Sequence, residues 1–337
     1  MKKLVLMFVA LFTMSASLFA DGLTATLQQG DVMTPFYGVD AFKNAYAAAE
    51  DGAIITLSSG LFNDVANISK QITIIGAYAF NENSPETTIL SSFIVTANNV
   101  KIEGVFVNHI TLGNISNCKI RRCWIKNLDA KTDNHINTII QQCVIQIDGA
   151  IGHGYNYSIT NSTIGYFSTM NTTNNIAYIA NCTIYKWYHY WTTAKTPNNS
   201  FDSSVKTPYA IYKNNIICFL DQNNIDSVKK TISPSEFYYN LFSDTWSSRT
   251  RIPLGFGDGC LNVGNMETAS ENLLTLEEYP SNPTTNILGM DGTVIGPNGG
   301  IGFKQYPSIP RITSKAIDSN TDAEGKLKVK ITVKAEQ

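Results

Sequence analysis

The chain has 337 residues, of which 43% are hydrophobic and 15% charged, and its formal net charge is −2. It has no basic cluster interleaved with aromatic residues and no polybasic segment, so the composition excludes a nucleic-acid-binding surface and an electrostatic membrane anchor. The length fits one large all-β domain or two ordinary domains, and the many Asn, Thr, Ile and Tyr residues favour β-structure with polar turns.

Residues 1–20 have the features of a secretory signal peptide. Lys2 and Lys3 precede an apolar run, and small residues lead to Ala20, after which we expect cleavage. The apolar run is too short to span a bilayer, and no later stretch is long and apolar enough to do so. We therefore expect an exported protein without a membrane span, located in the periplasm, at the cell surface or outside the cell.

A short helix is predicted near the start of the mature chain. Val39, Phe42, Tyr46 and Ala49 recur at helical spacing, and the Asp51-Gly52 pair ends the pattern. The stretches "AIITLSSGLF" and "KQITIIGAYAF" that follow read as strands. We expect the helix to cover the N-terminal end of the β-structure, where strand edges would otherwise be unpaired.

A repeat of about twenty residues follows. Its pattern is apolar-x-turn-x-x-apolar, and the turn residues lie 18, 20, 19, 20 and 33 positions apart. Short β-type segments at this period predict a parallel β-helix, a solenoid whose coils stack at about 4.8 Å. The turn residues are Gly104, Arg122, Gln142, Asn161, Asn181 and Asn214.

The residue after each turn position is predicted to form an internal column. It is Cys123, Cys143, Ser162, Cys182 and Asn215 in successive coils, and strand alternation points it inward. We expect buried free thiols that pack as small hydrophobic groups. A disulfide between neighbouring coils is the alternative, although parallel side chains on stacked strands strain its geometry. Cys118, Cys218 and Cys260 fall outside the column and receive no partner.

The segment "DAFKNAYAAAEDGAIITLSSGLFNDVANISKQITIIG", residues 40–76, resembles the opening of right-handed parallel β-helix proteins of the pectate-lyase-like superfamily. In that superfamily a helix, an Asp-Gly, a strand ending in Gly and an Ile-Gly follow in this order. The resemblance extends to about residue 242. It implies the fold rather than the chemistry, because the superfamily holds lyases, hydrolases, esterases and non-enzymes. The tail "DGTVIGPNGG" with "YPSIPRIT" is similar to the C-terminal segment of secreted Bacteroidetes β-helix proteins of unassigned function.

The expected organisation is a signal peptide, one domain and a tail. The domain spans residues 21–311, with coils over about 53–242 and loops packed on the last coils over 243–311. Residues 312–337 form the tail. Its segment "KLKVKITVK" alternates apolar residues with lysines, which predicts a half-buried strand that lies along the solenoid or caps its end.

The resemblance implies a substrate groove over one sheet, near segments 128–137, 148–156, 167–175 and 187–208. Asp129 and Asp133 offer oxygen ligands at alternating positions, as Ca²⁺ prefers. Lys131 is a candidate catalytic base for a lyase, and His135 lies close to it in sequence. A solvated polar loop would have the same composition, so both interpretations stay open.

Two further positions are candidates for catalysis. Asp148 aligns with the apolar Leu128 and Phe167, and a carboxylate in an apolar column needs a partner or a raised pKa. The alternative is that Gly149 bends the chain and turns Asp148 to solvent. His153 lies in a "GHG" that resembles one polygalacturonase motif, but the paired aspartates and the Arg-x-Lys of those enzymes are missing.

The gap between Asn181 and Asn214 is longer than one coil, and its extra length starts with "WYHYW". Long insertions on a solenoid face often carry binding sites. We expect Trp187 to continue the inward column. The candidates for stacking on sugar rings or for packing the loop are Tyr188, His189, Tyr190 and Trp191.

These observations favour an exported, monomeric β-helix that binds a polysaccharide, a cell-surface glycan or another extracellular partner, without a recognisable catalytic site. The alternative is a divergent polysaccharide lyase or glycoside hydrolase that acts on uronate-containing glycans. No cofactor is evident, and Ca²⁺ is the one candidate. A structural or adhesive surface protein is a third interpretation.

Overall fold

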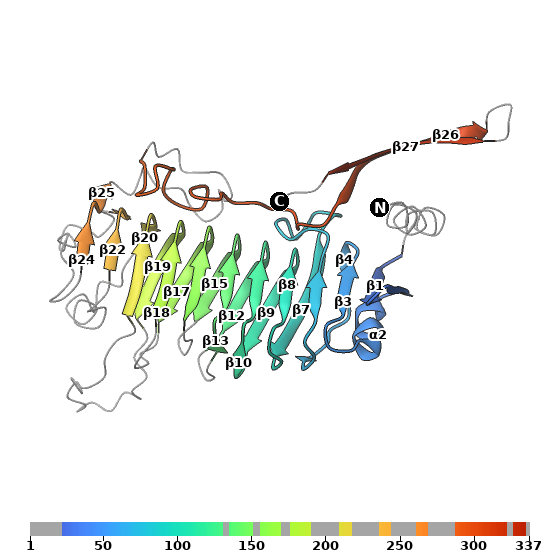
Figure 1. The fold of residues 1–337 in the computed structure, drawn as a ribbon, viewed down its shortest axis with the longest axis horizontal. Helices are drawn as coiled ribbons and strands as arrows, with labels where there is room; N and C mark the ends of the chain where they lie inside the picture. Colours follow the sequence, from blue (N-terminus) through green and yellow to red (C-terminus); the bar gives the residue numbers. More distant parts are fainter. Residues whose placement is uncertain are drawn as a thin grey trace.

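The computed structural model describes residues 22–130, 135–150, 156–169, 176–189, 209–217, 236–243, 261–268, 287–321 and 326–334. Within these residues the chain winds into a parallel β-solenoid whose coils stack along one axis, as Figure 1 shows. Two long sheets follow that axis, and each full coil adds a strand to both. The predicted parallel β-helix is confirmed.

The first long sheet, called sheet A, has twelve strands in the order β2-β1-β3-β6-β8-β11-β14-β16-β18-β20-β22-β24. These are β1 (Thr24–Gln29), β2 (Val32–Tyr37), β3 (Ile54–Leu57), β6 (Thr73–Ile75), β8 (Lys101–Glu103), β11 (Lys119–Arg121), β14 (Ile139–Gln141), β16 (Tyr157–Thr160), β18 (Ile176–Ala180), β20 (Tyr209–Lys213), β22 (Glu236–Tyr238) and β24 (Leu261–Val263).

The second long sheet, called sheet B, has eleven strands in the order β25-β23-β21-β19-β17-β15-β12-β9-β7-β4, with β5 also paired to β7. These are β4 (Gly60–Leu61), β5 (Asn67–Ile68), β7 (Thr88–Val95), β9 (Phe106–Leu112), β12 (Trp124–Asp129), β15 (Val144–Ala150), β17 (Thr163–Thr169), β19 (Thr183–His189), β21 (Ile216–Ile217), β23 (Leu241–Ser243) and β25 (Met266–Thr268). The short strands β10 (Ile115–Ser116) and β13 (His135–Ile136) pair on a third side of the coils.

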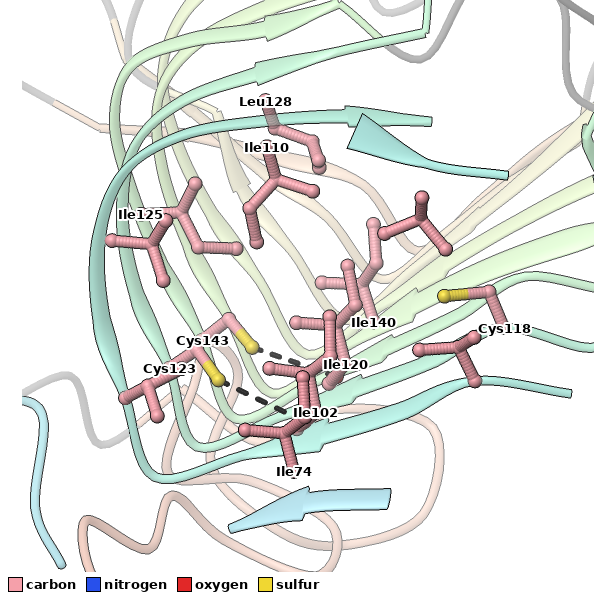
Figure 2. Close-up of a cluster of buried hydrophobic side chains, with 14 of the residues drawn as sticks. Ile74, Ile102, Ile110, Cys118, Ile120, Cys123, Ile125, Leu128, Ile140 and Cys143 are labelled. Atoms are coloured by element: carbon pink, nitrogen blue, oxygen red, sulfur yellow. Dashed lines mark hydrogen bonds between the residues drawn. The ribbon is translucent and has the colours of Figure 1, made fainter. Parts of the chain in front are cut away.

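The register of sheet A stacks one inward isoleucine of each coil on that of the coil before. Ile102, Ile120 and Ile140 are partners on β8, β11 and β14, and Ile159 and Ile179 continue the row. All five are buried, and Figure 2 shows part of this column facing Ile125 and Leu128 from sheet B. Each buried side chain of this size contributes about 1.5–3 kcal/mol, so the repeat of apolar residues drives the stacking of the coils.

One residue per coil bends the chain from sheet A into sheet B with a positive φ. These corner residues are Gly104 (69°), Arg122 (50°), Gln142 (57°), Asn161 (48°), Asn181 (53°), Asn214 (55°), Tyr239 (52°) and Gly264 (66°). The first six are the predicted turn residues. A left-handed backbone is costly for most residues but is accessible to Gly and tolerated by Asn, which explains the preference at these positions.

The opposite corner, where the chain enters sheet A, carries a second left-handed row. Asn99, Asn117 and Asn137 have φ values of 59°, 58° and 54°. Their exposed side chains form a ladder, in which the Nδ2 atoms of Asn137 and Asn117 each donate to the Oδ1 atom of the preceding asparagine at 3.1 Å. The ladder therefore links successive coils at this corner.

The predicted internal column lies directly after the first corner. Cys123, Cys143 and Cys182 are buried free thiols, and Cys118, outside the column, is a fourth. The strands that follow Cys143, Ser162 and Cys182 are consecutive partners in sheet B, so Cys143 and Cys182 lie two coils apart as expected. Cys218 and Cys260 lie outside the described residues.

Asparagines replace the thiols in the later coils. Asn215 Nδ2 donates to Ile179 O at 2.9 Å, and Asn240 Nδ2 donates to Tyr212 O at 2.9 Å. The same Nδ2 atoms reach the Oδ1 atom of the next asparagine, Asn240 or Asn265, at 2.9 Å. The column therefore binds each coil to its neighbours, and it continues one coil beyond the predicted end near residue 242.

The N-terminal end of the solenoid is closed by a hairpin and a helix. Strand β1 pairs antiparallel with β3 and so covers the edge of the first coil, while α2 (Ala41–Ala48) buries Phe42 in the core. Lys70 Nζ donates to the carbonyl oxygens of Tyr46 at 2.8 Å and Ala49 at 2.7 Å, which caps the helix C-terminus with a positive charge. The predicted helix is confirmed.

Residues 287–310, called the C-terminal strap, run back along the first corner from the late coils toward the early ones (Figure 1). Met290 N donates to Asn214 Oδ1 (2.9 Å), Asn161 Nδ2 to Pro297 O (2.9 Å) and Gly299 O (2.6 Å), Gln142 Nε2 to Gly302 O (2.8 Å), Arg122 Nη1 to Tyr306 O (2.8 Å) and Ser308 N to Glu103 Oε1 (2.8 Å). The strap is therefore bound to the corner side chains of successive coils.

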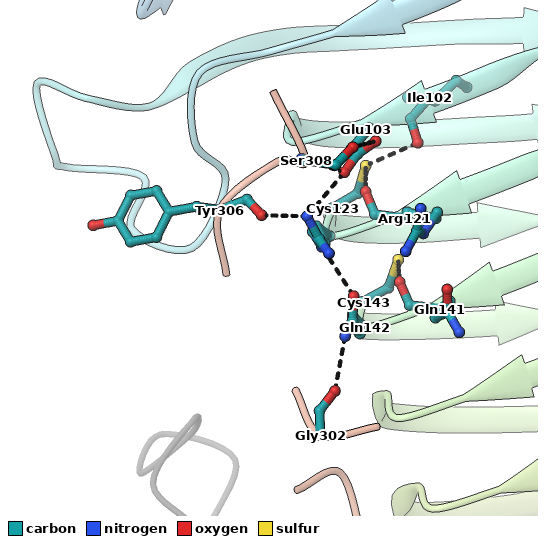
Figure 3. A network of polar contacts seen from close by, with 11 residues as sticks. Ile102, Glu103, Arg121, Cys123, Gln141, Gln142, Cys143, Gly302, Tyr306 and Ser308 are labelled. Carbon is teal, nitrogen blue, oxygen red and sulfur yellow. Dashed lines mark hydrogen bonds and ion pairs between the residues drawn. The ribbon is translucent and has the colours of Figure 1, made fainter. Parts of the chain in front are cut away.

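Arg122 is the centre of this contact, and Figure 3 labels its partners Glu103, Gln142 and Tyr306. Its side chain is 1% exposed, and Nε donates to Gln142 Oε1 at 2.9 Å while Nη1 lies 3.3 Å from Glu103 Oε1. Arg122 is thus paired within the protein and does not face solvent. A buried guanidinium is tolerated because hydrogen bonds and a carboxylate compensate its lost hydration.

Glycines let the strap approach the corners closely. A Cβ atom on Gly300 would lie 2.6 Å from Asn181 Nδ2, and one on Gly289 would lie 2.4 Å from Asn214 Cγ. Larger residues at these two positions would push the strap away from the solenoid. This explains the glycines at both ends of the segment from 289 to 300.

The last strand differs from its prediction. β27 (Leu327–Lys334) pairs antiparallel with β26 (Arg311–Thr321), and this hairpin extends away from the solenoid in Figure 1. Val329, Ile331 and Val333 are 49%, 44% and 48% exposed, and the strand neither lies along the coils nor caps their end. The alternating pattern indicated a strand but did not reveal that its apolar side lacks a covering layer among the described residues.

We predict that Asn161→Gly loosens the strap. Glycine accepts the left-handed backbone, so the substitution removes only the two hydrogen bonds to Pro297 O and Gly299 O. Buried carbonyl groups without a donor should lower the free energy of unfolding by about 1–3 kcal/mol, measured by urea denaturation. The matched control is Asn117→Gly, whose side chain is exposed and bonds only within the amide ladder. Equal losses in both variants would contradict this role of the strap.

We also predict protected thiols. Burial raises the pKa of Cys118 and of Cys182 from 9.0 to about 12. At about pH 8, iodoacetamide should modify them only after unfolding, because the thiolate is the nucleophile. The raised folded-state pKa also means that their contribution to stability is fully present below about pH 9 and is lost as the pH rises toward 12. Mass spectrometry of native and unfolded samples tests the first point, and equal labelling of both would contradict it.

Candidate functional site

The outer face of sheet B carries two rows of polar residues along the solenoid axis. In the first row, Ser92, His109, Asn127 and Asp148 are consecutive partners on β7, β9, β12 and β15. The chain bends after the buried Val107, and Asn108 and His109 are both half-buried before the next inward residue, Ile110. Because the strands are parallel and in register, residues of one row lie about 4.8 Å apart.

The second row lies two residues further along the same strands. Thr111 and Asp129 are partners on β9 and β12, and Asp129 pairs in turn with Ala150. Ser168 and Tyr188 are partners on β17 and β19. The exposed Ile94 on β7 begins this row. The two rows together are called the sheet B surface.

Asp148 does not occupy the apolar column in which the sequence alignment placed it. A register shift separates Ile145 from Gly149, and Leu128 pairs with Gly149 instead of Asp148. The bulge adds one residue to β15, so Asp148 takes the register position next to Asn127 on the outer face.

The bulge is accommodated by the neighbouring strand. Gly165 on β17 is buried, and a Cβ atom there would lie 1.9 Å from Gln146 O. Only glycine leaves room for the displaced backbone of β15. Beyond the bulge, Phe167 and Trp187 are register partners on β17 and β19.

His135 lies away from the sheet B surface. Its side chain is fully buried on β13, where Nδ1 lies 3.0 Å from Thr138 Oγ1 and the ring packs against Tyr157 with centroids 5.7 Å apart. A ring held in this way offers no face to a ligand outside the protein. The proximity of His135 to Asp129 in sequence therefore does not become proximity in a shared site.

The other candidates are distributed as follows. Asp129 is half-buried at the end of β12 on the sheet B surface. The backbones of Tyr188 and His189 pair with Ser168 and Thr169. The candidates outside the described residues are Lys131, Asp133, His153, Tyr190 and Trp191. In the sequence they follow strands β12, β15 and β19.

The polar groups beside the rows are held in fixed positions. Lys126 Nζ lies 3.0 Å from Glu82 Oε1 and 5.1 Å from the centre of the Phe106 ring. Trp124 Nε1 donates to Gln146 Oε1 at 3.3 Å. These contacts order the edge of the sheet B surface that lies nearest the first corner.

Sequence analysis missed His109 and Asn127. Both precede the predicted groove segments, which begin at residue 128, and neither belongs to a motif. The available signal was the break in alternation between Val107 and Ile110, because two polar residues between two inward residues indicate a bend in the strand. Such a bend places both polar residues on the outer face.

The arrangement suits binding more directly than bond cleavage. It offers a hydroxyl, an imidazole, an amide and carboxyl groups in rows, all of which hydrogen-bond to sugar hydroxyl groups. Asp129 and Asp148 sit on adjacent strands, two register positions apart. Among the described residues, no group of three or more His, Cys, Asp or Glu side chains is placed to hold a metal ion.

Comparisons with known proteins do not add a family. No helix among the described residues is long and apolar enough to cross a membrane. Searches against family models, curated proteins and solved structures found no match to this chain. The structure shows the fold to be a parallel β-solenoid. The superfamily suggested by residues 40–76 stays a prediction.

Proposed function

We propose that the protein is exported and binds an extended polysaccharide along the sheet B surface. The observation that carries the proposal is the in-register row of Ser92, His109, Asn127 and Asp148 on four consecutive strands. A polymer aligned with the solenoid axis would meet equivalent polar groups at intervals of about 4.8 Å. A small ligand would gain nothing from such a repeat.

The second row supports a polymeric ligand. Thr111 and Asp129 add hydroxyl and carboxylate groups beside the first row, and Tyr188 brings an aromatic residue to its far end by register. Aromatic rings present a large apolar face with a polar handle, which suits the faces and hydroxyl groups of sugars. The signal peptide predicted over residues 1–20 would bring this surface into contact with extracellular or periplasmic glycans.

A second candidate function is cleavage of the bound glycan. Asp129 and Asp148 occupy outward register positions on neighbouring strands, offset by two residues. Glycoside hydrolases use two carboxyl groups on either side of the scissile bond, about 5–9.5 Å apart according to mechanism. The register is compatible with such a pair, and it is the one observation that favours an enzyme.

Binding is tested by affinity electrophoresis and calorimetry of the mature protein with a panel of neutral and uronate-containing polysaccharides. His109→Ala and Asn127→Ala should each weaken binding by about three- to tenfold, since each removes a hydrogen-bonding group worth about 0.5–1.5 kcal/mol. The control is Thr160→Ala on the outer face of sheet A. Binding that is unchanged in both sheet B variants, or no binding to any glycan, would overturn the proposal.

Cleavage is tested with the same glycans by following reducing ends and the absorbance of unsaturated products, with and without Ca²⁺. If the protein is a hydrolase, Asp129→Asn and Asp148→Asn should each lower turnover by at least about a hundredfold while leaving binding measurable. A lyase would instead release unsaturated products. Binding without turnover in the unchanged protein would reject the enzyme and leave the binding function.

A further inference from the structure

The outer face of sheet A carries a compact group of positive charges near its N-terminal end. Lys101 on β8 and Lys119 on β11 are in-register partners, and Arg121 lies two residues after Lys119 on the same face. The intervening Ile102 and Ile120 are fully buried, which fixes the outward register of all three. Lys101, Lys119 and Arg121 are called the sheet A cations.

The acidic residue in the same part of the face is already engaged. Glu103 is the in-register partner of Arg121, but its carboxylate accepts hydrogen bonds from Ser308 N at 2.8 Å and Ser308 Oγ at 3.0 Å. It also pairs with the buried Arg122 at 3.3 Å. Among the described residues, neither Lys101, Lys119 nor Arg121 forms an ion pair.

Holding the sheet A cations together is unfavourable for the protein alone. Like charges directly opposite one another on neighbouring strands are destabilising. The pKa of Lys119 is lowered, first by partial burial and then by the charges of Arg121 and Lys101. Arg121 Nε is buried without a hydrogen-bond acceptor in the part of the chain that the structure describes. A local conflict of this kind is typical of a functional site.

An amide row borders the cations. Asn99 and Asn117 precede Lys101 and Lys119 by two residues on the exposed corner, and their side chains form the ladder that continues to Asn137. Each ladder Nδ2 atom has two hydrogens and uses one of them within the ladder. The second hydrogen of each amide is available to a hydroxyl group of a ligand.

We propose that the sheet A cations bind a sulfate ester of a polysaccharide, with the amide ladder contacting the sugar that carries it. Two ammonium groups on strands about 4.8 Å apart can bracket one tetrahedral oxyanion. The guanidinium of Arg121 supplies further N–H donors to another oxygen of the same group. A sulfate ester has three terminal oxygens, one for each cation, whereas a carboxylate offers two. This site lies on a different sheet from the proposed binding rows of sheet B and does not depend on them.

The test compares binding of dextran sulfate, unsubstituted dextran, inorganic sulfate and a phosphorylated dextran to the full mature chain by calorimetry. Dextran sulfate should bind, and the double variant Lys101→Gln/Arg121→Gln should weaken it by at least tenfold. The matched control is Lys43→Gln/Lys330→Gln, which removes two positive charges from exposed lysines on α2 and β27. An equal loss in this control would show non-specific charge attraction and overturn the site.

The other outcomes are also decisive. Tighter binding of the phosphorylated polymer would overturn the assignment to sulfate, and inorganic sulfate as strong as the polymer would overturn the role of the sugar. Without ligand, the double variant should keep or raise its Tm, because it relieves repulsion. A merely structural role would lower Tm instead. If His109→Ala abolishes dextran binding but retains dextran sulfate binding, the sheet A cations and the sheet B surface are separate sites.

Discussion

The structure depends on how the polar groups at the corner of each coil find hydrogen-bond partners. A parallel solenoid must reverse direction within one or two residues, and here a left-handed residue does so between sheet A and sheet B in eight successive coils, from β8 and β9 to β24 and β25. The left-handed residue leaves its side chain and neighbouring peptide groups pointing away from both sheets. At the first corner these groups find partners in the C-terminal strap, as with Asn161 and Gln142. At the opposite corner the asparagines find partners in one another. The two corners solve one problem of hydrogen bonding in two ways, and only the first needs a distant segment of the chain.

The internal column shows the same requirement from the inside. The residue after the corner donates to a carbonyl oxygen of the previous coil, whether the donor is the Cys143 thiol at 3.6 Å from Ile120 O or the Asn240 amide at 2.9 Å from Tyr212 O. A thiol is a weak donor and an amide a strong one. The early coils are also bound by regular rows of isoleucine, whereas in later coils Tyr212 stacks on Phe237 with ring centroids 4.8 Å apart. The late coils, in which the apolar packing is less regular, are therefore joined by stronger hydrogen bonds.

The sequence predicted the stacked positions that recur in each coil, but it did not predict the features that occur once. Vertical neighbours such as Cys143, Ser162 and Cys182 follow from the period alone, because the backbone fixes one coil per repeat. The period alone left two positions open for Asp148, because a one-residue bulge shifts the register of a strand and changes the coil length by no more than the repeat already varies. The strap was not predicted along its whole length, since Arg122 meets Tyr306 through a backbone oxygen that has no sequence signature. His109 was missed for a related reason, because a bend rather than a motif exposes it.

The same geometry explains why the two outer faces differ in the ligands they suit. In-register parallel strands align the equivalent positions of successive coils in a row along the axis. The same kind of side chain is then repeated along one face at a fixed spacing. The row through His109 and Asn127 on sheet B is mixed and polar, which fits a chain of hydroxyl groups. On sheet A the row changes from Lys101 and Lys119 to Ile139 within one coil, so the charge is a local group and not a stripe. A local group of charges suits one charged substituent on a polymer, whereas a row of polar side chains suits an extended length of the polymer chain. The strap contributes to this difference, because Ser308 engages Glu103 and leaves the neighbouring cations without a partner from their own face.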